Sequence, residues 1–446
     1  MKLALTEEEI MKKIVLFFDA IMRNYLPDPF VIAVILTYVV YGFAAIFTDS
    51  SPLEISTYWG DGLWGLLSFM TQMSLILLSG FVVASSKPVK GALTRLAQLP
   101  TNSTQVILTT FFVSSLACWV NWGLGLVVSA FVALEMAKVH KDVSFRLLVA
   151  ISYMGFVFWH GGLSGSIPLV VSTPDNFSQE WIGSLIPVSE TIFSSMNFII
   201  ILGLLILLGL MAVFLNKRSD DDVTVVIEES SLKEDIPELK TASERMDYSR
   251  LVNFAVLSLG VSYLYALIFQ DKFSFNINTV NLFFILIGVF LYPNIKSYLR
   301  AVDQGSKKLG PILVQYPLYA GIMGIIVKTG LVNEISSFFV SISTEKTYPV
   351  LTFLSAGLVN LFVPSGGGQW AVQAPIVVKG AQALGVPFSK VIMAVAWGDA
   401  WTNLAQPFWA IPVLSIAGLG AKDIMGYCFM ALLVSGVFIS TVLFFF

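Results

Sequence analysis

Long apolar runs recur along this chain of 446 residues, and they constrain its fold more than any other feature. Segments 30–47, 192–215 and 424–446 reach or approach the roughly 20 residues that a membrane-spanning helix needs. Charged residues make up only 12% of the chain, whereas soluble domains carry about 25%. The alternating ten-residue segments of an outer-membrane barrel do not occur. We therefore predict an all-α polytopic membrane protein.

The apolar pattern predicts about nine membrane-crossing segments: 30–47, 62–86, 147–171, 191–215, 251–270, 279–293, 309–328, 388–415 and 424–446. Two more apolar stretches, 105–137 and 348–386, are interrupted near their middles by glycines, and we expect both to be re-entrant helical hairpins. The mixed-charge segment 1–28 is predicted to be an amphipathic helix on the inner membrane face. The polar segment 216–250 is predicted to be a cytoplasmic linker.

The distribution of Lys and Arg orients this topology. With the N-terminus in the cytoplasm and both hairpins returning to the side they enter, 21 of the 26 Lys and Arg lie on the inner side. Short cytoplasmic loops are enriched in Lys and Arg in this way. We therefore place the N-terminus in the cytoplasm and the C-terminus on the outer side of the membrane. We expect the lipid bilayer as a partner, with no nucleic acid and no cofactor.

The two halves of the chain, 29–215 and 251–446, are predicted to be repeats. Shifted by 243 residues, segment 62–170 lies over 305–413 without a gap. By the charge count, one copy starts outside and the other inside, so the repeats are inverted, as in many secondary transporters. The matched positions include Gln72 with Gln315, Gly123 with Gly366, Gly125 with Gly368, and Gly155 with Gly398.

Four breaks interrupt the apolar segments, at 121–125, 160–168, 363–370 and 399–407. Bare backbone cannot face lipid, so such breaks are buried or line a wet cavity, and restarting helices point free N–H groups at anions. We expect all four breaks to meet near the middle of the membrane. The candidate substrate-binding residues are Asn121, Gly123, Gly125, His160, Ser164, Ser365, Gly366, Gly367, Gly368, Gln369, Thr402 and Asn403.

Asp399 is an acidic residue in the middle of an apolar segment, and such residues mark ion or substrate paths. We predict that it couples transport to Na⁺ or H⁺, with Na⁺ slightly favoured because of the neutral oxygens of Asn121, Ser365, Thr402 and Asn403. No metal other than Na⁺ is expected. The breaks lack basic residues, which favours a small monocarboxylate. Tryptophans that could wall its pocket are Trp122, Trp159, Trp370, Trp397, Trp401 and Trp409.

Four strings carry a resemblance to a known family: VNWGLG at 120–125, WHGGLSGSIPL at 159–169, VPSGGGQW at 363–370 and GDAWTNLAQPFWAIP at 398–412. With them, nearly the whole chain resembles the AtoE-type short-chain fatty acid transporters. The resemblance implies uptake of acids such as butyrate or acetoacetate across a bacterial inner membrane, which would place the C-terminus in the periplasm.

More distantly, the chain is similar to the ion-transporter superfamily, which implies two hairpins, inverted repeats, a homodimer and a moving transport domain. In that superfamily, Ser-Asn-Thr motifs at the hairpin tips bind sodium. Here Trp122 follows Asn121, no Asn-Thr follows Ser365, and Thr402-Asn403 lies at a helix break instead.

The leading hypothesis is thus cation-coupled symport of short-chain fatty acids with alternating access. Alternatives are a dicarboxylate or other organic-anion carrier or exporter, and a passive anion channel. An integral-membrane enzyme would need a nucleophile and a base, for which His160 and a nearby serine are the candidates. The sequence leaves open the acyl chain length, the coupling ion, the direction of transport, the oligomeric state and the role of His160.

Overall fold

The computed structural model describes residues 27–216, 241–406 and 409–446, and these are folded into helices and loops without a β-strand among them. Residues 1–26 of the predicted amphipathic segment and 217–240 of the predicted linker lie outside the described residues.

Eleven helical elements make up the described part of the first half. They are α2 (Pro29–Phe47), α3 (Pro52–Gly62), α4 (Leu67–Ser85), α5 (Lys87–Leu96), α6 (Ser103–Val120), α7 (Trp122–Val139), α8 (Phe145–Met154), the 3-10 helix η1 (Gly155–Phe158), α9 (Ser166–Ser172), α10 (Gln179–Ile182) and α11 (Ser195–Asn216).

The described part of the second half follows a similar succession. Its elements are α12 (Ala242–Asp247), α13 (Arg250–Phe269), α14 (Ile277–Leu291), α15 (Ile295–Ser306), α16 (Gly310–Lys328), α17 (Leu331–Ser341), α18 (Tyr348–Asn360), α19 (Gly366–Leu384), α20 (Phe388–Thr402), α21 (Ile411–Ala417), η2 (Ala421–Asp423) and α22 (Met425–Phe445).

Eight helices among the described residues are long and apolar enough to cross a membrane: α2, α4, α6, α7, α11, α13, α16 and α22. The sequence predicts about nine crossing segments and two hairpins. The lists differ because both arms of the first hairpin, α6 and α7, reach spanning length. The predicted segments 147–171 and 388–415 are each divided by a break into shorter helices, and the predicted segment 279–293 forms α14, which has only 15 residues.

Local sequence explains many of the helix starts. The side chains of Asn102 and Asn121 accept the N–H groups of Gln105 and Leu124, each at 2.9 Å, and so cap α6 and α7. Proline lies in the first turn of α2, α3, α5, α16 and α18, where its missing N–H costs no hydrogen bond.

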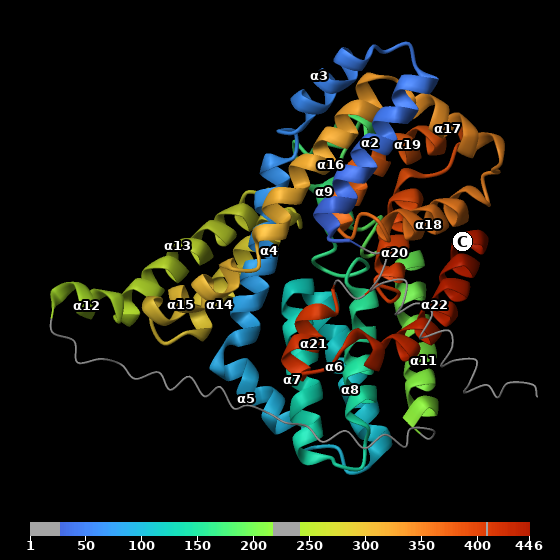
Figure 1. Cartoon of the computed structure of the whole chain (residues 1–446). Helices are drawn as coiled ribbons and strands as arrows, with labels where there is room; N and C mark the ends of the chain where they lie inside the picture. The colour runs from blue at the N-terminus through green and yellow to red at the C-terminus, as the bar shows by residue number, and fades with distance from the viewer. Residues whose placement is uncertain (1–26, 217–240, 407–408) are drawn as a thin grey trace, which may run out of the picture.

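The helix bounds of the two halves keep the predicted spacing. The limits of α4 moved by 243 residues are those of α16, and the limits of α3 fall within one residue of those of α15. In Figure 1, α6 and α7 lie in the lower half of the molecule, whereas α18 and α19 lie in the upper half. The two hairpins thus approach the centre from opposite ends.

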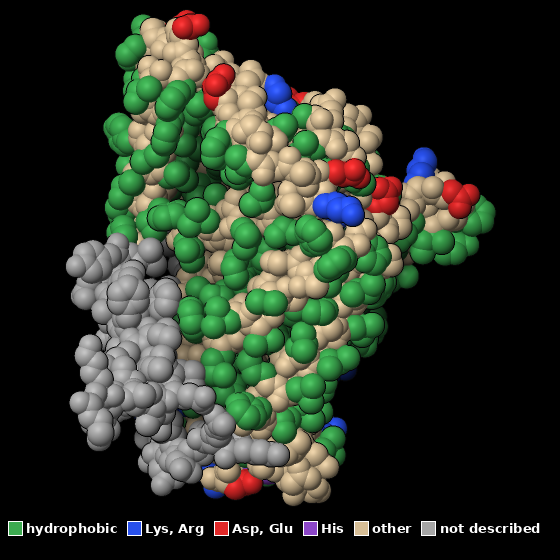
Figure 2. Space-filling model, turned by 90° about the vertical axis from the view of Figure 1, so that its right-hand side faces the viewer, with side chains coloured by type: hydrophobic (Ala, Val, Ile, Leu, Met, Phe, Trp, Pro, Cys, Tyr) green, Lys and Arg blue, Asp and Glu red, His purple; other side chains and the backbone are tan. Residues whose placement is uncertain are grey.

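The outer surface suits a lipid environment. In Figure 2 the middle of the visible face is covered by hydrophobic side chains and backbone, while charged side chains gather towards its upper part and lower edge. Helix α13 projects at the left of Figure 1, and Asn253 is its one buried residue. The Asn253 amide attaches α13 to α14 by donating to the carbonyls of Val289 and Tyr292, at 2.9 and 3.1 Å.

Candidate substrate-binding site

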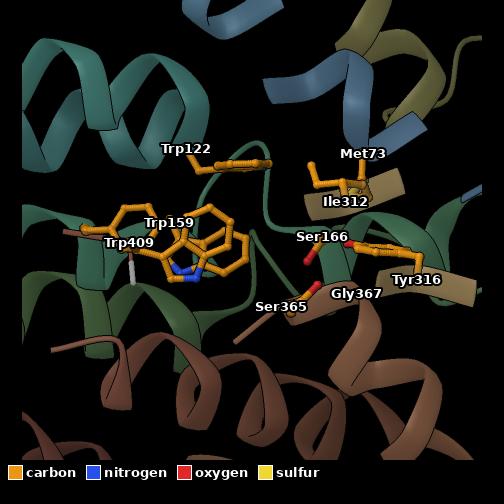
Figure 3. Close-up of a pocket in the computed structure, with 11 residues that line it drawn as sticks. Met73, Trp122, Trp159, Ser166, Ile312, Tyr316, Ser365, Gly367 and Trp409 are labelled. Atoms are coloured by element: carbon orange, nitrogen blue, oxygen red, sulfur yellow. The ribbon is translucent and has the colours of Figure 1, made fainter. Parts of the chain in front are cut away.

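A small cavity lies where the first three breaks meet, with Trp409 just beyond the fourth break also in its lining, which Figure 3 shows. Its volume is about 30 Å³. Neither Lys nor Arg lines it. The lining residues are Met73, Trp122, Phe156, Trp159, Ser166, Ile312, Tyr316, Ser365, Gly366, Gly367 and Trp409.

The tip of the first hairpin is closed by its own neighbours. Asn121 caps α7, and the N–H of Trp122 donates to the Ser164 hydroxyl at 2.9 Å. A Cβ on Gly123 would lie 2.9 Å from the Leu77 carbonyl oxygen, and one on Gly125 would overlap Cys118. Both glycines therefore serve close packing, and neither lines the cavity.

The break after η1 is held against this first tip. The N–H of Leu163 donates to the Trp119 carbonyl at 2.7 Å, and the Trp119 indole donates to the Gly161 carbonyl at 3.2 Å. The Asn197 amide also donates to the Gly161 carbonyl, at 2.9 Å, and its oxygen accepts the Trp397 indole N–H at 3.0 Å. These bonds satisfy backbone groups that the break leaves outside any helix.

His160 lies beside the cavity and supports its wall. Nδ1 is 2.8 Å from the Ala396 carbonyl oxygen, which can only accept, so Nδ1 carries a hydrogen. Nε2 is 3.0 Å from the hydroxyl of Ser166, a residue that lines the cavity. His160 is fully buried, and its Nδ1 lies 4.0 Å from Asp399 Oδ1. The enzyme alternative would use this same His160–Ser166 pair.

The second tip leaves backbone donors open towards the cavity. The Ser365 hydroxyl accepts the N–H of Gly368 at 3.4 Å, and the Ser365 carbonyl accepts that of Gln369 at 2.7 Å. Among the described residues, none accepts the N–H of Gly366 or Gly367. These two groups stand at the N-terminus of a 19-residue helix, where backbone geometry and dipole favour an anion.

The three glycines of this tip have little space for side chains. A Cβ on Gly367 would overlap the Phe69 ring and lie 3.1 Å from the Tyr316 hydroxyl. Gly368 packs against Tyr319 and does not line the cavity. Gln369 is fully buried behind the tip and donates to the Ala356 carbonyl at 2.8 Å.

A buried polar network lies around Asn360. Its amide nitrogen is 2.8 Å from the Asp399 carbonyl, 2.9 Å from Thr402 Oγ1 and 3.0 Å from Asn403 Oδ1. The Gln406 amide reaches the Asn403 oxygen at 3.2 Å. This network joins the end of α18 to the break after α20.

Only part of the predicted coupling set comes together. Asp399 is 1% exposed, and its Oδ1 accepts from the Asn403 amide at 3.5 Å. Its Oδ2 has no hydrogen-bond partner among the described residues. Thr402 and Asn403 share the network with Asp399, whereas no hydrogen bond joins Asn121 or Ser365 to it within the described structure.

Of the twelve predicted binding residues, Ser365, Gly366 and Gly367 line the cavity. Sequence reasoning missed five further lining residues, Met73, Phe156, Ser166, Ile312 and Tyr316. It also missed Asn360, which is at the centre of the buried polar network. Ser166 stands in the quoted string at 159–169, and Asn360 is an amide in an otherwise apolar hairpin arm, so both carried a signal. The other four look like ordinary apolar or aromatic helix residues.

Aromatic rings close the other end of the cavity. The ring centres of Trp122 and Trp409 are 5.5 Å apart, and those of Phe156 and Trp159 are 5.7 Å apart. The indole N–H groups of Trp122 and Trp159 are buried and have no partner among the described residues. Buried donors are normally paired, so these two are available to a bound molecule or water. The cavity therefore has an aromatic end and an end of hydroxyls and backbone amides.

Comparisons with known proteins identify the family. Residues 10–446 match the family model described as short chain fatty acid transporter. A relative from Escherichia coli (strain K12), named for short-chain fatty acid transport, is 41% identical over 425 residues, which are 94% of this chain and 96% of the relative. A relative from Haemophilus influenzae (strain ATCC 51907 / DSM 11121 / KW20 / Rd) with the same name is 38% identical over 427 residues, again 94% and 96%.

A solved structure also shares the fold. The YdaH transporter of Alcanivorax borkumensis superposes with a TM-score of 0.61 at 15% identity, covering 93% of this chain and 98% of that one. The apolar helices and the bacterial relatives together indicate a bacterial membrane protein. The matched family consists of transporters, which decides against the enzyme alternative. By the family match and by both relatives, this chain belongs to the short-chain fatty acid transporter family.

Proposed function

We propose that the protein takes up short-chain fatty acids such as butyrate by cation-coupled symport, with alternating access to the central cavity. The observation that carries the proposal is this cavity, which three of the four breaks and Trp409 line and which has one aromatic end and one hydrogen-bonding end. A short-chain fatty acid has the same two parts, a carboxylate and a short alkyl tail.

The carboxylate binds at the second hairpin tip. The open N–H groups of Gly366 and Gly367 and the hydroxyls of Ser365 and Ser166 lie at one end of the cavity. Backbone N–H groups at a helix N-terminus stabilise an anion without a basic side chain. The absence of Lys and Arg from the lining favours one carboxylate over two, and so argues against a dicarboxylate substrate.

Substrate enters by movement of the walls. The rings at the aromatic end of the cavity contact one another, so the described state is closed at that end. The walls come from two hairpins that approach from opposite ends, so displacement of one half relative to the other opens the site to one side at a time. This closed state supports a carrier over a passive channel.

Asp399 serves the coupling ion. Its buried Oδ2 lacks a partner among the described residues, and a buried carboxylate needs Na⁺ or H⁺ to balance its charge. The neutral oxygens of Thr402 and Asn403 belong to the same network and can serve as additional Na⁺ ligands.

We also propose a homodimer in the inner membrane, with the N-terminus in the cytoplasm. Native Cys118 and Cys428 are buried, so single exposed cysteines can report sidedness. Asp142→Cys should react with an impermeant maleimide only from the cytoplasm, and Glu180→Cys only from the periplasm. Labelling of both from one side contradicts the orientation. Cross-linking in native membranes tests the dimer, and a monomer alone would disprove it.

The function is tested by uptake of labelled butyrate into proteoliposomes. Accumulation should be saturable and should depend on an inward Na⁺ or H⁺ gradient. Uptake that is linear in butyrate and never exceeds equilibrium would instead identify the anion channel. Succinate serves as the dicarboxylate control. Effective competition by succinate would identify the protein as a dicarboxylate carrier instead.

A further inference from the structure

We propose that four aromatic rings set the acyl chain length that the transporter accepts. These rings, called here the aromatic box, belong to Trp122, Phe156, Trp159 and Trp409, and all four line the cavity. The inference rests on the proposed function and adds a specificity element to the same site.

The rings of the aromatic box contact one another in a closed cycle. Ring centres are 6.0 Å apart for Trp122 and Trp159, and 5.7 Å for Trp159 and Phe156. They are 6.0 Å apart for Phe156 and Trp409, and 5.5 Å for Trp409 and Trp122. All four distances fall in the range of direct aromatic contact. The aromatic box is therefore shut in the described state, and an alkyl tail can enter only by separating the rings.

The position of the bound carboxylate determines the direction in which the alkyl tail extends. In Figure 3, Ser166, Ser365 and Gly367 lie on the opposite side of the cavity from Trp159 and Trp409. A fatty acid held by its carboxylate among those three residues extends its tail towards the aromatic box. Each methylene buried there raises affinity about fourfold.

The gain in affinity with each added methylene ends when the four rings cannot move further apart. The box comes from three segments: the first residue of α7, the stretch from η1 to Trp159, and the loop after α20. The chain-length limit is therefore reached when these segments cannot move further apart. Removing one ring should move the limit to longer acids.

The test is competition by a series of straight-chain acids, from acetate to octanoate, against labelled butyrate in proteoliposomes. We compare Phe156→Ala with Phe158→Ala. Phe158 is a matched control because it lies in the same short helix and is equally buried at 1% exposure, yet it does not line the cavity. Phe156→Ala should raise the affinity for hexanoate relative to butyrate by roughly fifteenfold, which is two methylenes at about fourfold each.

An unchanged chain-length profile in Phe156→Ala overturns the inference. So does a shift produced by Ile312→Ala instead, which would place the tail on the opposite side of the cavity. If Phe156→Ala is not recovered in membranes, Trp409→Leu, on the loop after α20, provides the same comparison. Failure of the wild type to carry any of these acids defeats the proposed function itself. A normal wild-type profile with unchanged variants defeats only the aromatic box.

Discussion

The two halves of the chain contribute differently to the same cavity. Positions 243 residues apart pair Trp122 with Ser365, Phe156 with Asp399, and Trp159 with Thr402. In each pair the first half supplies an aromatic ring and the second half supplies a polar group. Ser166 and Trp409 are the reverse case. Corresponding positions have thus diverged: the aromatic rings of the first half line the cavity, as does Ser365 of the second, whereas Asp399 and Thr402 lie in the polar network around Asn360.

The hairpin tips show the same divergence in their backbones. At the first tip, Ser164 accepts the N–H of Trp122, and Asn121 accepts that of Leu124. At the second tip, the N–H groups of Gly366 and Gly367 stay open within the described structure. A similar turn can therefore serve as a structural support in one half and as a binding site in the other.

The largest expected effect is at the second tip. Gly367→Val should reduce butyrate uptake to the level of empty liposomes, because its side chain would collide with Phe69 and crowd the open N–H groups. Its amount in the membrane should stay near that of Gly91→Val, where no atom lies within 4 Å of the new Cβ. Wild-type uptake by Gly367→Val would show that the substrate binds elsewhere.

The next effect concerns the buried polar network of the second half. Asp399→Asn keeps the side-chain shape but removes the charge that the coupling ion balances. Gradient-driven accumulation should fall about tenfold, a typical coupling energy. Exchange of labelled for unlabelled butyrate should change less. Asp142→Asn, at an exposed acid, is the control, and full accumulation by Asp399→Asn under both gradients removes Asp399 from the coupling role.

A smaller effect is expected at Ser365, the residue that caps α19. Ser365→Ala removes a hydroxyl that lines the cavity and caps α19. The KM for butyrate should rise roughly fivefold to tenfold, the equivalent of about 1 kcal/mol for one hydrogen bond. Binding to purified protein, followed as a ligand-induced Tm increase, gives a second measurement. An unchanged KM would indicate that the hydroxyl only shapes the helix start.

The smallest effect belongs to the first tip. Asn121→Ala removes a cap that points away from the cavity, so it should cost about 1 kcal/mol of stability and lower Tm. Its KM for butyrate should remain within about twofold of the wild type, because the variant leaves the substrate contacts in place. A rise in KM equal to that of Ser365→Ala would remove the proposed difference between the tips.

Sequence reasoning located the breaks because Gly, Pro and polar residues are conspicuous in apolar segments. It could not decide which side of each helix faces the centre. Tyr316 and Met73 lie in helices that are apolar all round, so no amphipathic pattern marks their inward face. Gly123 and Gly125 looked like binding residues because close packing and ligand approach both require glycine. Only the contacts that a glycine makes with distant segments show whether it serves close packing or ligand approach.

Asn197, which supports the break after η1, accepts a hydrogen bond from Trp397, a residue 200 positions later in the chain. A ribosome produces Asn197 well before α20, so the amide oxygen of the newly made first half has no indole N–H to accept. The same holds for His160, whose Nδ1 partner is the Ala396 carbonyl. These two hydrogen bonds between the halves can therefore form only after translation has passed α20.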